Sequence, residues 1–249
     1  MTDKVLITAA YRGELEALRD LPPNWIAEPC GIGGVAAAAG LAMLVAMHQP
    51  GRIIVLGTCG ALGRGLSIGS LVAPKIVRWV DPGVLNGTAH MPPNVYKALQ
   101  IAPWPGLPPA VCLQTPSVTL AADHATRLAT LTEPGLPVVE HLELYSMAFV
   151  AHTFGLPISA ILGVTNAVGP TGHRDWVQNH KRVETLVQEA VFKYDRPNRP
   201  APSPLDGPVI RPHIPIAKPK APSQGPAGPN GDSPPAPGGP QRKWLAENN

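Results

Sequence analysis

Two glutamates and one asparagine stand where their side-chain types and positions could support chemistry. Glu14 follows the apolar run KVLITAA, and Glu143 follows LPVVE at the start of a helical pattern. Asn166 closes the apolar, β-branched run PISAILGVTN and leads into a loop of polar and aromatic residues. A carboxylate that is partly withdrawn from water needs a partner. If the three runs are strands of one sheet, their carboxyl ends form a single site suited to acid–base chemistry.

Each glutamate also has a purely structural interpretation. Acidic residues are common in the first turn of a helix, because the helix dipole favours negative charge there. Taken singly, Glu14, Glu143 and Asn166 do not define a site. Their shared position at the carboxyl ends of three predicted strands favours the functional interpretation.

Apolar strand-like runs alternate with helical patterns through the first 195 residues. Strands are predicted at 4–10, 52–62, 68–81, 110–119, 136–140 and 156–166. Helices are predicted at 13–21, 31–49, 121–131, 141–155 and 175–194. This alternation indicates an α/β fold with three α/β/α layers and a mixed, largely parallel central sheet. Ligands bind such sheets at the carboxyl ends of the strands, here near residues 9–14, 57–63, 116–119, 139–143 and 164–176.

The chain divides into a predicted catalytic domain, residues 1–195, and a tail, residues 196–249. The tail has 15 prolines in 54 residues. It is expected to be disordered or polyproline-like, because it offers too little apolar surface to offset the entropy of ordering. Its seven Lys or Arg and three Asp or Glu give a net charge of +4, and the whole chain carries +3, which leaves −1 for the domain. No nucleic-acid-binding face is therefore expected on the domain, while weak attraction of the tail to anions or membranes stays open.

The cysteines and the N-terminal residues indicate a cytoplasmic protein. Cys30, Cys59 and Cys112 are widely spaced and odd in number, so neither a disulfide framework nor a zinc site is expected. The N-terminal run MTDKVLITAAYRG lacks the pattern of a signal peptide. No run reaches the ~18 apolar residues of a membrane span. We therefore expect neither a metal nor a membrane partner.

Two glycine-rich stretches invite nucleotide-binding interpretations. GIGGVAAAAG contains Gly-x-Gly, but Ala36 replaces the third glycine of the dinucleotide motif, and no strong strand is expected in the proline-broken NWIAEPC before it. A tight turn and close helix packing explain these glycines more simply. LGTCGALGRG lacks the lysine of a triphosphate-binding loop. Thr58 in this stretch offers a hydroxyl to a substrate, with close packing alone as an equal alternative.

Three segments together resemble the purine nucleoside phosphorylase/nucleosidase superfamily. They are GIGGVAAAAGLA, VLGTCGALGRGLSIGSLVAP and VEHLELYSMAFVAHTFGLPI, and the resemblance covers nearly all of residues 4–193. The phosphorylases' Gly-Asp-Pro and arginine phosphate clamp is absent near the first strand, whereas TAAYRGELEAL is similar to the start of the nucleosidases. The resemblance implies a nucleosidase, an enzyme that hydrolyses the N-glycosidic bond of a nucleoside.

The resemblance also implies roles for individual residues. Glu14 matches the glutamate that engages the attacking water, and Glu143 matches the ribose-binding glutamate. Leu142 occupies the usual methionine position before that glutamate, and Thr58 is expected near the ribose and the water. The family requires no metal or organic cofactor. Its members commonly form dimers, so a homo-oligomer (a dimer or larger) is expected.

The segment TNAVGPTGHRDW resembles the Ser-Asn-x-Val-Gly-Pro and following Trp of futalosine hydrolases. Thr165 and Asn166 stand where related adenine nucleosidases have Ser-Asp, and Trp176 matches in place. An amide cannot protonate the departing base, but it can donate a hydrogen bond to N7 and recognise a 6-oxopurine. TPSVT is similar to a Ser-Thr-Val-Thr segment, which places three more residues along the base: Ser117, Val118 and Thr119.

The implied reaction is hydrolysis of a 6-oxopurine nucleoside, with futalosine giving hypoxanthine and dehypoxanthine futalosine in menaquinone biosynthesis. Three departures weaken the match to that substrate: Arg174-Asp175 is displaced, His141-Leu142-Glu143 replaces Asn-Met-Glu, and Ser70 replaces an aspartate. Two alternatives stay open. One is a methylthioadenosine/adenosylhomocysteine nucleosidase, against which Asn166 argues. The other is a catalytically degenerate family member that binds a nucleoside.

Overall fold

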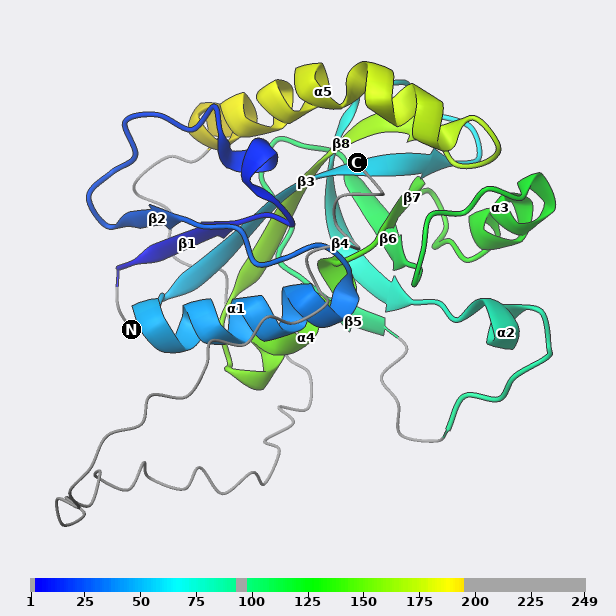
Figure 1. Cartoon of the computed structure of the whole chain (residues 1–249), viewed down its shortest axis with the longest axis horizontal. Coiled ribbons are helices and arrows are strands. Elements are labelled where there is room, and N and C mark those ends of the chain that lie inside the picture. The colour runs from blue at the N-terminus through cyan, green and yellow to red at the C-terminus, as the bar shows by residue number, and fades with distance from the viewer. Residues whose placement is uncertain (1–2, 93–97, 195–249) are drawn as a thin grey trace, which may run out of the picture. The chain divides into compact units, whose positions relative to one another are not determined.

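The computed structural model describes residues 3–92 and 98–194, coloured in Figure 1. Its strands are β1 (Val5–Thr8), β2 (Trp25–Ala27), β3 (Arg52–Leu62), β4 (Leu71–Trp79), β5 (Ala98–Gln100), β6 (Pro109–Gln114), β7 (Val138–His141) and β8 (Ile158–Ala167). Its helices are the 3-10 helix η1 (Arg12–Leu15) and the α-helices α1 (Gly34–His48), α2 (Pro82–Leu85), α3 (Ala122–Ala129), α4 (Leu144–Thr153) and α5 (Gly172–Tyr194). The predicted tail and the boundary before residue 196 lie outside the described residues.

The strands form one mixed sheet that closes on itself. β8 lies between β3 and β4, β4 continues to β6, and β6 pairs with β7, which returns to the end of β3. β1 and β2 extend the sheet from the first half of β3, and β5 pairs with β4. Parallel pairings outnumber antiparallel ones within the described sheet, so the predicted mixed, largely parallel α/β architecture is confirmed.

The closure of the sheet is a feature that the strand pattern did not predict. The ladder between β3 and β8 shifts register between Cys59 and Gly60. Such an irregularity bends a strand and increases its twist. Beyond it, Gly60 lies between Asn166 of β8 and Glu140 of β7. The sheet therefore has a barrel-like closure around the end of β3, which the predicted layered arrangement did not include.

Helices cover the sheet from two sides (Figure 1). α1 and α4 pack together, and Leu41, Leu44 and Met147 join their core to β3 and β8. α5 lies over the other side and turns Val183 and Val187 toward the sheet, spaced so that both fall on one helix face. No helix in the described part of the chain combines the length and apolar character needed to cross a bilayer.

Two sequence predictions for these elements were wrong in extent. The helix expected at 13–21 is only the short turn η1, because Pro22 follows closely and Asp20 adopts a left-handed backbone with φ of 52°. The strand expected at 110–119 ends at Gln114, before Pro116. The glycine-rich stretch, before which no strong strand was expected, is preceded by the three-residue strand β2. A strand of three residues carries too little periodicity to be recognised.

The glycines that begin and line α1 serve a tight turn and close packing, as the sequence indicates. Gly33 precedes α1 with φ of 83°, a conformation that other residues rarely adopt. Inside the helix, a Cβ atom on Gly40 would lie 1.8 Å from the carbonyl oxygen of Cys30. α1 therefore packs directly against the backbone that leads from β2 into the glycine turn.

Replacing Gly40 by alanine tests this close approach. Helix propensity alone predicts that Gly40→Ala stabilises α1 by about 1 kcal/mol. The clash with the Cys30 carbonyl predicts the opposite, a loss of about 1–3 kcal/mol as the helix is displaced. We expect urea unfolding to show the loss, with exposed Ala39→Ser on the same helix as control. A more stable Gly40→Ala variant would contradict the packing.

Candidate active site

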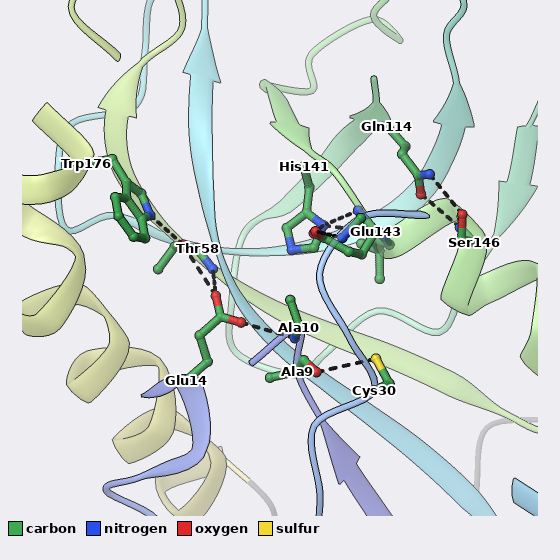
Figure 2. Close-up of polar contacts among 12 residues, drawn as sticks. Ala9, Ala10, Glu14, Cys30, Thr58, Gln114, His141, Glu143, Ser146 and Trp176 are labelled. Atoms are coloured by element: carbon green, nitrogen blue, oxygen red, sulfur yellow. Dashed lines mark hydrogen bonds and ion pairs between the residues drawn. The ribbon is translucent and has the colours of Figure 1, made fainter. Parts of the chain in front are cut away.

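Glu14 is a buried carboxylate held by backbone N–H groups from two strand ends. Its Oε2 accepts a hydrogen bond from the N–H of Ala10, at 3.2 Å, and its Oε1 accepts from the N–H of Thr58, at 3.0 Å (Figure 2). Its side chain thus joins the end of β1 to the middle of β3. The pKa of Glu14 is raised to about 8. Burial is the largest cause, the charges of Glu143 and Glu184 act in the same direction, and the hydrogen bonds from the Thr58 and Ala10 N–H groups oppose the shift.

Glu143 is the second buried carboxylate, and it points into the same region as Glu14 (Figure 2). It is the first residue before α4, but its side chain does not cap that helix. Its Oε1 instead accepts a hydrogen bond from the N–H of Gly33, at 2.8 Å, where α1 begins. The glycine turn before α1 thus holds the Glu143 side chain in place through a backbone N–H group.

His141, rather than Glu143, caps the start of α4. Its Nδ1 accepts hydrogen bonds from the N–H groups of Glu143 and Leu144, both at 3.1 Å. Complete burial lowers the pKa of His141, so the ring is neutral with its proton on Nε2. The 3.2 Å approach of Nδ1 to Glu143 Oε2 is then a close contact and not an ion pair. His141 thus leaves the Glu143 carboxylate available to a substrate.

Thr58 and Trp176 extend the hydrogen bonds around Glu14. The indole N–H of Trp176, on α5, donates to Oγ1 of Thr58 at 3.3 Å. The Thr58 hydroxyl in turn donates to Glu14 Oε1, at 3.4 Å. Figure 2 shows Trp176, Thr58 and Glu14 along one line of contacts. The structure therefore brings together four predicted site residues, Glu14, Thr58, Glu143 and Trp176.

Thr165 and Asn166 lie at the end of β8 beside β3. The Thr165 hydroxyl is within reach of the Cys59 carbonyl oxygen, at 3.2 Å, and of Asn166 Oδ1, at 2.7 Å. Asn166 Nδ2 donates to the carbonyl oxygen of Ala167, at 3.0 Å. The amide group of Asn166 carries two hydrogens on Nδ2, so the second one is left for another acceptor.

The residues predicted along the base lie in the loop after β6. Ser117 and Val118 are exposed, and Leu142, beside Glu143, is half-buried. Thr119 is buried and donates its hydroxyl to Glu140 Oε1, as Thr115 does at 3.0 Å. The hydroxyl hydrogen of Thr119 is therefore used in a hydrogen bond to Glu140, a residue that the sequence analysis did not single out.

A pocket of about 570 Å³ opens beside this loop. Ser117, Val118 and Thr119 contribute to it from the loop, and His124 and Arg127 contribute from α3. Neither Glu14 nor Glu143 is among its lining residues. This pocket thus adjoins the residues predicted to lie along the base, while the two buried carboxylates lie outside its lining.

The described residues offer no ready metal site. Within 3–92 and 98–194, no group of three or more His, Cys, Asp or Glu side chains is arranged to hold an ion. Cys30, Cys59 and Cys112 are buried, unpaired thiols. Burial raises the pKa of Cys30 to about 11, so it is protonated, and its Sγ donates to the Ala9 carbonyl oxygen at 3.3 Å.

Sequence reasoning missed several polar residues that support this cluster: Tyr11, Gln114, Glu140, His141 and Glu184. Gln114 illustrates the reason, because its amide binds the hydroxyl and the N–H of Ser146 across the first turn of α4, at 2.8 and 2.9 Å. Such residues act through partners that are distant in the chain. The available signal was position for two of them, since Glu140 ends the strand predicted at 136–140 and His141 follows it. Gln114 lies inside the strand predicted at 110–119, and only the structure shows that β6 ends there.

Comparison with known proteins supports the same class of fold. No family model matches the chain. The 5′-methylthioadenosine/S-adenosylhomocysteine nucleosidase of Halalkalibacterium halodurans is 28% identical over 152 residues, which are 56% of this chain and 66% of that relative. The match thus spans slightly less than two thirds of the curated relative.

Solved structures of two kinds of nucleosidase share the fold. A mutant of the Helicobacter pylori 5′-methylthioadenosine/S-adenosylhomocysteine nucleosidase, with 5′-methylthioadenosine in its active site, has a TM-score of 0.66 at 15% identity, covering 78% of this chain and 98% of its own. A mutant of the H. pylori futalosine hydrolase has a TM-score of 0.65 at 15% identity, with the same coverage. The fold is that of the nucleoside phosphorylase/nucleosidase superfamily, as the sequence motifs indicate. Its structural neighbours include methylthioadenosine/adenosylhomocysteine nucleosidases and futalosine hydrolases.

The burial of Glu14 predicts a pH-dependent stability. A carboxyl whose folded-state pKa, about 8, exceeds the ordinary 4.5 contributes stability that is fully present below pH 4.5 and is lost as the pH rises through 8. Glu14→Gln lacks this dependence. Its melting temperature relative to wild type should therefore increase between pH 5 and 8.5.

Calorimetry or thermal circular dichroism across this range checks the expectation. Glu16→Gln, an exposed carboxylate two residues away, controls for the loss of a negative charge from the same segment. If the difference in melting temperature between Glu14→Gln and wild type stays constant with pH, ionisation of Glu14 does not destabilise the folded protein.

Proposed function

We propose that the chain hydrolyses the N-glycosidic bond of a purine nucleoside. The observation that carries the proposal is the pairing of Glu14 and Glu143, two buried carboxylates from distant parts of the chain that enter one region, each anchored by backbone N–H groups. Two carboxylates with different environments are suited to different tasks in glycosidic hydrolysis. The likeness to nucleosidases in sequence and in structure supports the same reaction.

Glu14 accepts the proton of the attacking water. A general base is most effective when its pKa lies near the working pH, and the Glu14 pKa of about 8 meets this condition. The water oxygen bonds to C1′ of the ribose while the bond from C1′ to the base nitrogen breaks. The bonding electron pair leaves with the base, which is released after protonation. Thr58 keeps the Glu14 carboxylate directed toward the water.

Glu143 stabilises the ribose as positive charge develops on it. Its Oε1 is held by Gly33, and its Oε2 is available to accept a hydrogen bond from a ribose hydroxyl. A carboxylate fixed in a water-poor site favours an oxocarbenium-like transition state over the ground state. The neutral ring of His141 does not compensate this charge, because Nδ1 carries no proton.

The base is assigned to the 6-oxopurine class through Asn166. An amide donates a hydrogen bond to N7 without being able to protonate it, which suits a base such as hypoxanthine. The substrate proposed on these grounds is futalosine, and the likeness to the H. pylori futalosine hydrolase structure supports it. The proposed partner is therefore a small-molecule nucleoside, and the protein is proposed to act in the cytoplasm as a homo-oligomer.

A second candidate is a methylthioadenosine/adenosylhomocysteine nucleosidase. The observation that favours it is the 28% identity to the H. halodurans enzyme of that name. The same pair of glutamates serves either substrate, so the two candidates differ in the base and in the 5′ substituent. Asn166 is the residue of this chain that favours the 6-oxopurine.

Chromatography of the released base distinguishes these candidates. Futalosine, inosine and methylthioadenosine are each incubated with the full chain, with and without phosphate. We expect phosphate-independent release of hypoxanthine from futalosine. In Asn166→Asp, the preference should move toward the 6-amino substrate, because a carboxylic acid can protonate N7 of adenine. Release of adenine alone by wild type would favour the second candidate, and an unchanged preference in the variant would refute the role of Asn166.

Removing the charge of Glu143 tests the ribose contact. Glu143→Gln keeps the shape of the side chain but loses the negative charge that stabilises the transition state. We expect kcat to fall by about 100–1000-fold, the usual cost of losing one electrostatic stabiliser. The exposed Glu189→Gln on α5 serves as the matched control. Near-normal turnover by Glu143→Gln would exclude the proposed role.

A further inference from the structure

Polar and aromatic residues recur at every fourth position along α5, on the face toward η1. They are Trp176, His180, Glu184 and Gln188. Residues four apart lie on one face of a helix, and α5 packs against both η1 and β3 (Figure 1). We call these four residues the α5 stripe. Its members contact Thr58 and the segment around Glu14.

One end of the α5 stripe holds the chain just after η1. Gln188 Oε1 accepts hydrogen bonds from the N–H groups of Ala17 and Leu18, at 2.6 and 3.1 Å. These N–H groups belong to a turn that is not continued as a helix. Gln188 is buried and its own Nε2 donates to the carbonyl oxygen of Glu184, at 3.0 Å. The turn that carries Glu14 is therefore fixed to α5 at its carboxyl side.

Glu184 holds the same turn at its other side. The hydroxyl of Tyr11 donates a hydrogen bond to Glu184 Oε1, and His180 Nδ1 contacts the same oxygen at 2.9 Å. Because the acceptor is a carboxylate, His180 Nδ1 carries a proton. Glu184 is buried, with 7% of its surface exposed. Tyr11 immediately precedes η1. The turn that carries Glu14 is therefore hydrogen-bonded to α5 on both sides, by Glu184 before η1 and by Gln188 after it.

The other end of the α5 stripe reaches Glu14 through aromatic stacking. The rings of His180 and Trp176 stack with centroids 4.3 Å apart and planes 11° apart. Trp176 donates to Thr58, and Thr58 donates to Glu14. A continuous set of contacts thus runs from Glu184 through His180 and Trp176 to the catalytic carboxylate.

The charged and titratable groups around Glu14 come from three other elements and from its own segment. Glu184 and His180 belong to α5, Glu143 precedes α4, Cys30 lies before α1, and Tyr11 precedes η1. The negative charges of Glu184 and Glu143 both raise the pKa of Glu14, and Tyr11 is held protonated because burial and Glu184 raise its pKa. Of these two glutamates, Glu184 also fixes the position of the Glu14 turn, through its hydrogen bond from Tyr11.

We propose that Glu184 is a positioning residue for Glu14: through Tyr11, His180 and Trp176 it holds the Glu14 turn, and its buried charge sets the pH range in which Glu14 accepts a proton from water. This inference rests on the proposed hydrolase function. It assigns to α5 an influence on the ionisation of the proposed general base.

The test compares pH profiles of kcat/KM for the released base. In wild type, activity should fall as the pH drops below about 8, because Glu14 becomes protonated. Glu184→Gln keeps an oxygen that accepts from Tyr11 and His180 but removes the charge. The acidic limb should then move to lower pH by roughly 1 unit, the lower end of shifts caused by a neighbouring charge. Glu189→Gln, exposed on the same helix, should keep the wild-type limb.

A second variant predicts a shift of the opposite sign. Tyr11→Phe removes the hydroxyl that hydrogen-bonds to Glu184, so the charge of Glu184 acts on Glu14 with less compensation, and the acidic limb should move to higher pH. A purely structural role would lower activity without moving the limb in either variant, and that result overturns the proposal. If Glu184→Gln does not fold, the direction of the Tyr11→Phe shift decides alone.

A spectroscopic titration separates this proposal from the proposed function. The ¹³C resonance of the Glu14 carboxyl, assigned by its loss in Glu14→Gln, is followed against pH without substrate. A lower midpoint in Glu184→Gln supports the coupling even if no nucleoside is cleaved, in which case the proposed function alone fails. An unchanged midpoint overturns the coupling whatever the activity.

Discussion

The rest of this structure depends on the burial of the Glu14 carboxylate between the end of β1 and the middle of β3. An ionised carboxyl withdrawn from water is costly unless hydrogen bonds replace its hydration. The N–H groups of Ala10 and Thr58 supply two of these bonds, and they are positioned by parallel pairing of β1 with β3. The sheet thus holds the carboxylate in place. The two hydrogen bonds do not fully offset the effect of burial, so the pKa of Glu14 rises to about 8. This balance brings the proton exchange of Glu14 close to neutral pH.

The second carboxylate, that of Glu143, has different hydrogen-bond partners from those of Glu14. Glu143 lies where two helices begin: His141 satisfies the first N–H groups of α4, and the N–H at the start of α1 is left to Glu143. Helix N-termini favour a charged carboxylate, whereas the surroundings of Glu14 favour a protonated one. Two chemically identical side chains are therefore placed in different environments by the elements that surround them. The glycine turn before α1 is required because Gly33 must present its N–H with a left-handed backbone.

The closure of the sheet brings these groups together. β8 lies between β3 and β4, and the irregularity after Cys59 lets the end of β3 pair with β7. The carboxyl ends of β1, β7 and β8 consequently meet beside the second half of β3, and α5 packs against β3 and β8. Sequence patterns identified most of these strands with nearly correct limits, because long apolar runs have few alternatives in an α/β chain. The short strands β2 and β5 and the single turn η1 were missed or misjudged, since local preference is weak over three or four residues.

The sequence by itself determined the class of fold and the order of the long elements, because long apolar runs and the helical patterns between them are strong signals. It also singled out Glu14, Glu143, Thr58 and Trp176 as candidate site residues, because each follows an apolar run or matches a motif. It could not determine which polar residues support them. His141 accepts hydrogen bonds at the start of α4. Glu140 accepts hydrogen bonds from the hydroxyls of Thr115 and Thr119, and Glu184 accepts one from the hydroxyl of Tyr11. The contacts of the two glutamates form only because segments far apart in the chain are packed together. Hydrogen-bond partners and pKa values depend on distances and burial, which are properties of the folded arrangement and not of local sequence. Only the tertiary structure therefore decided that Glu14 is surrounded by negative charge and that Glu143 faces the start of a helix.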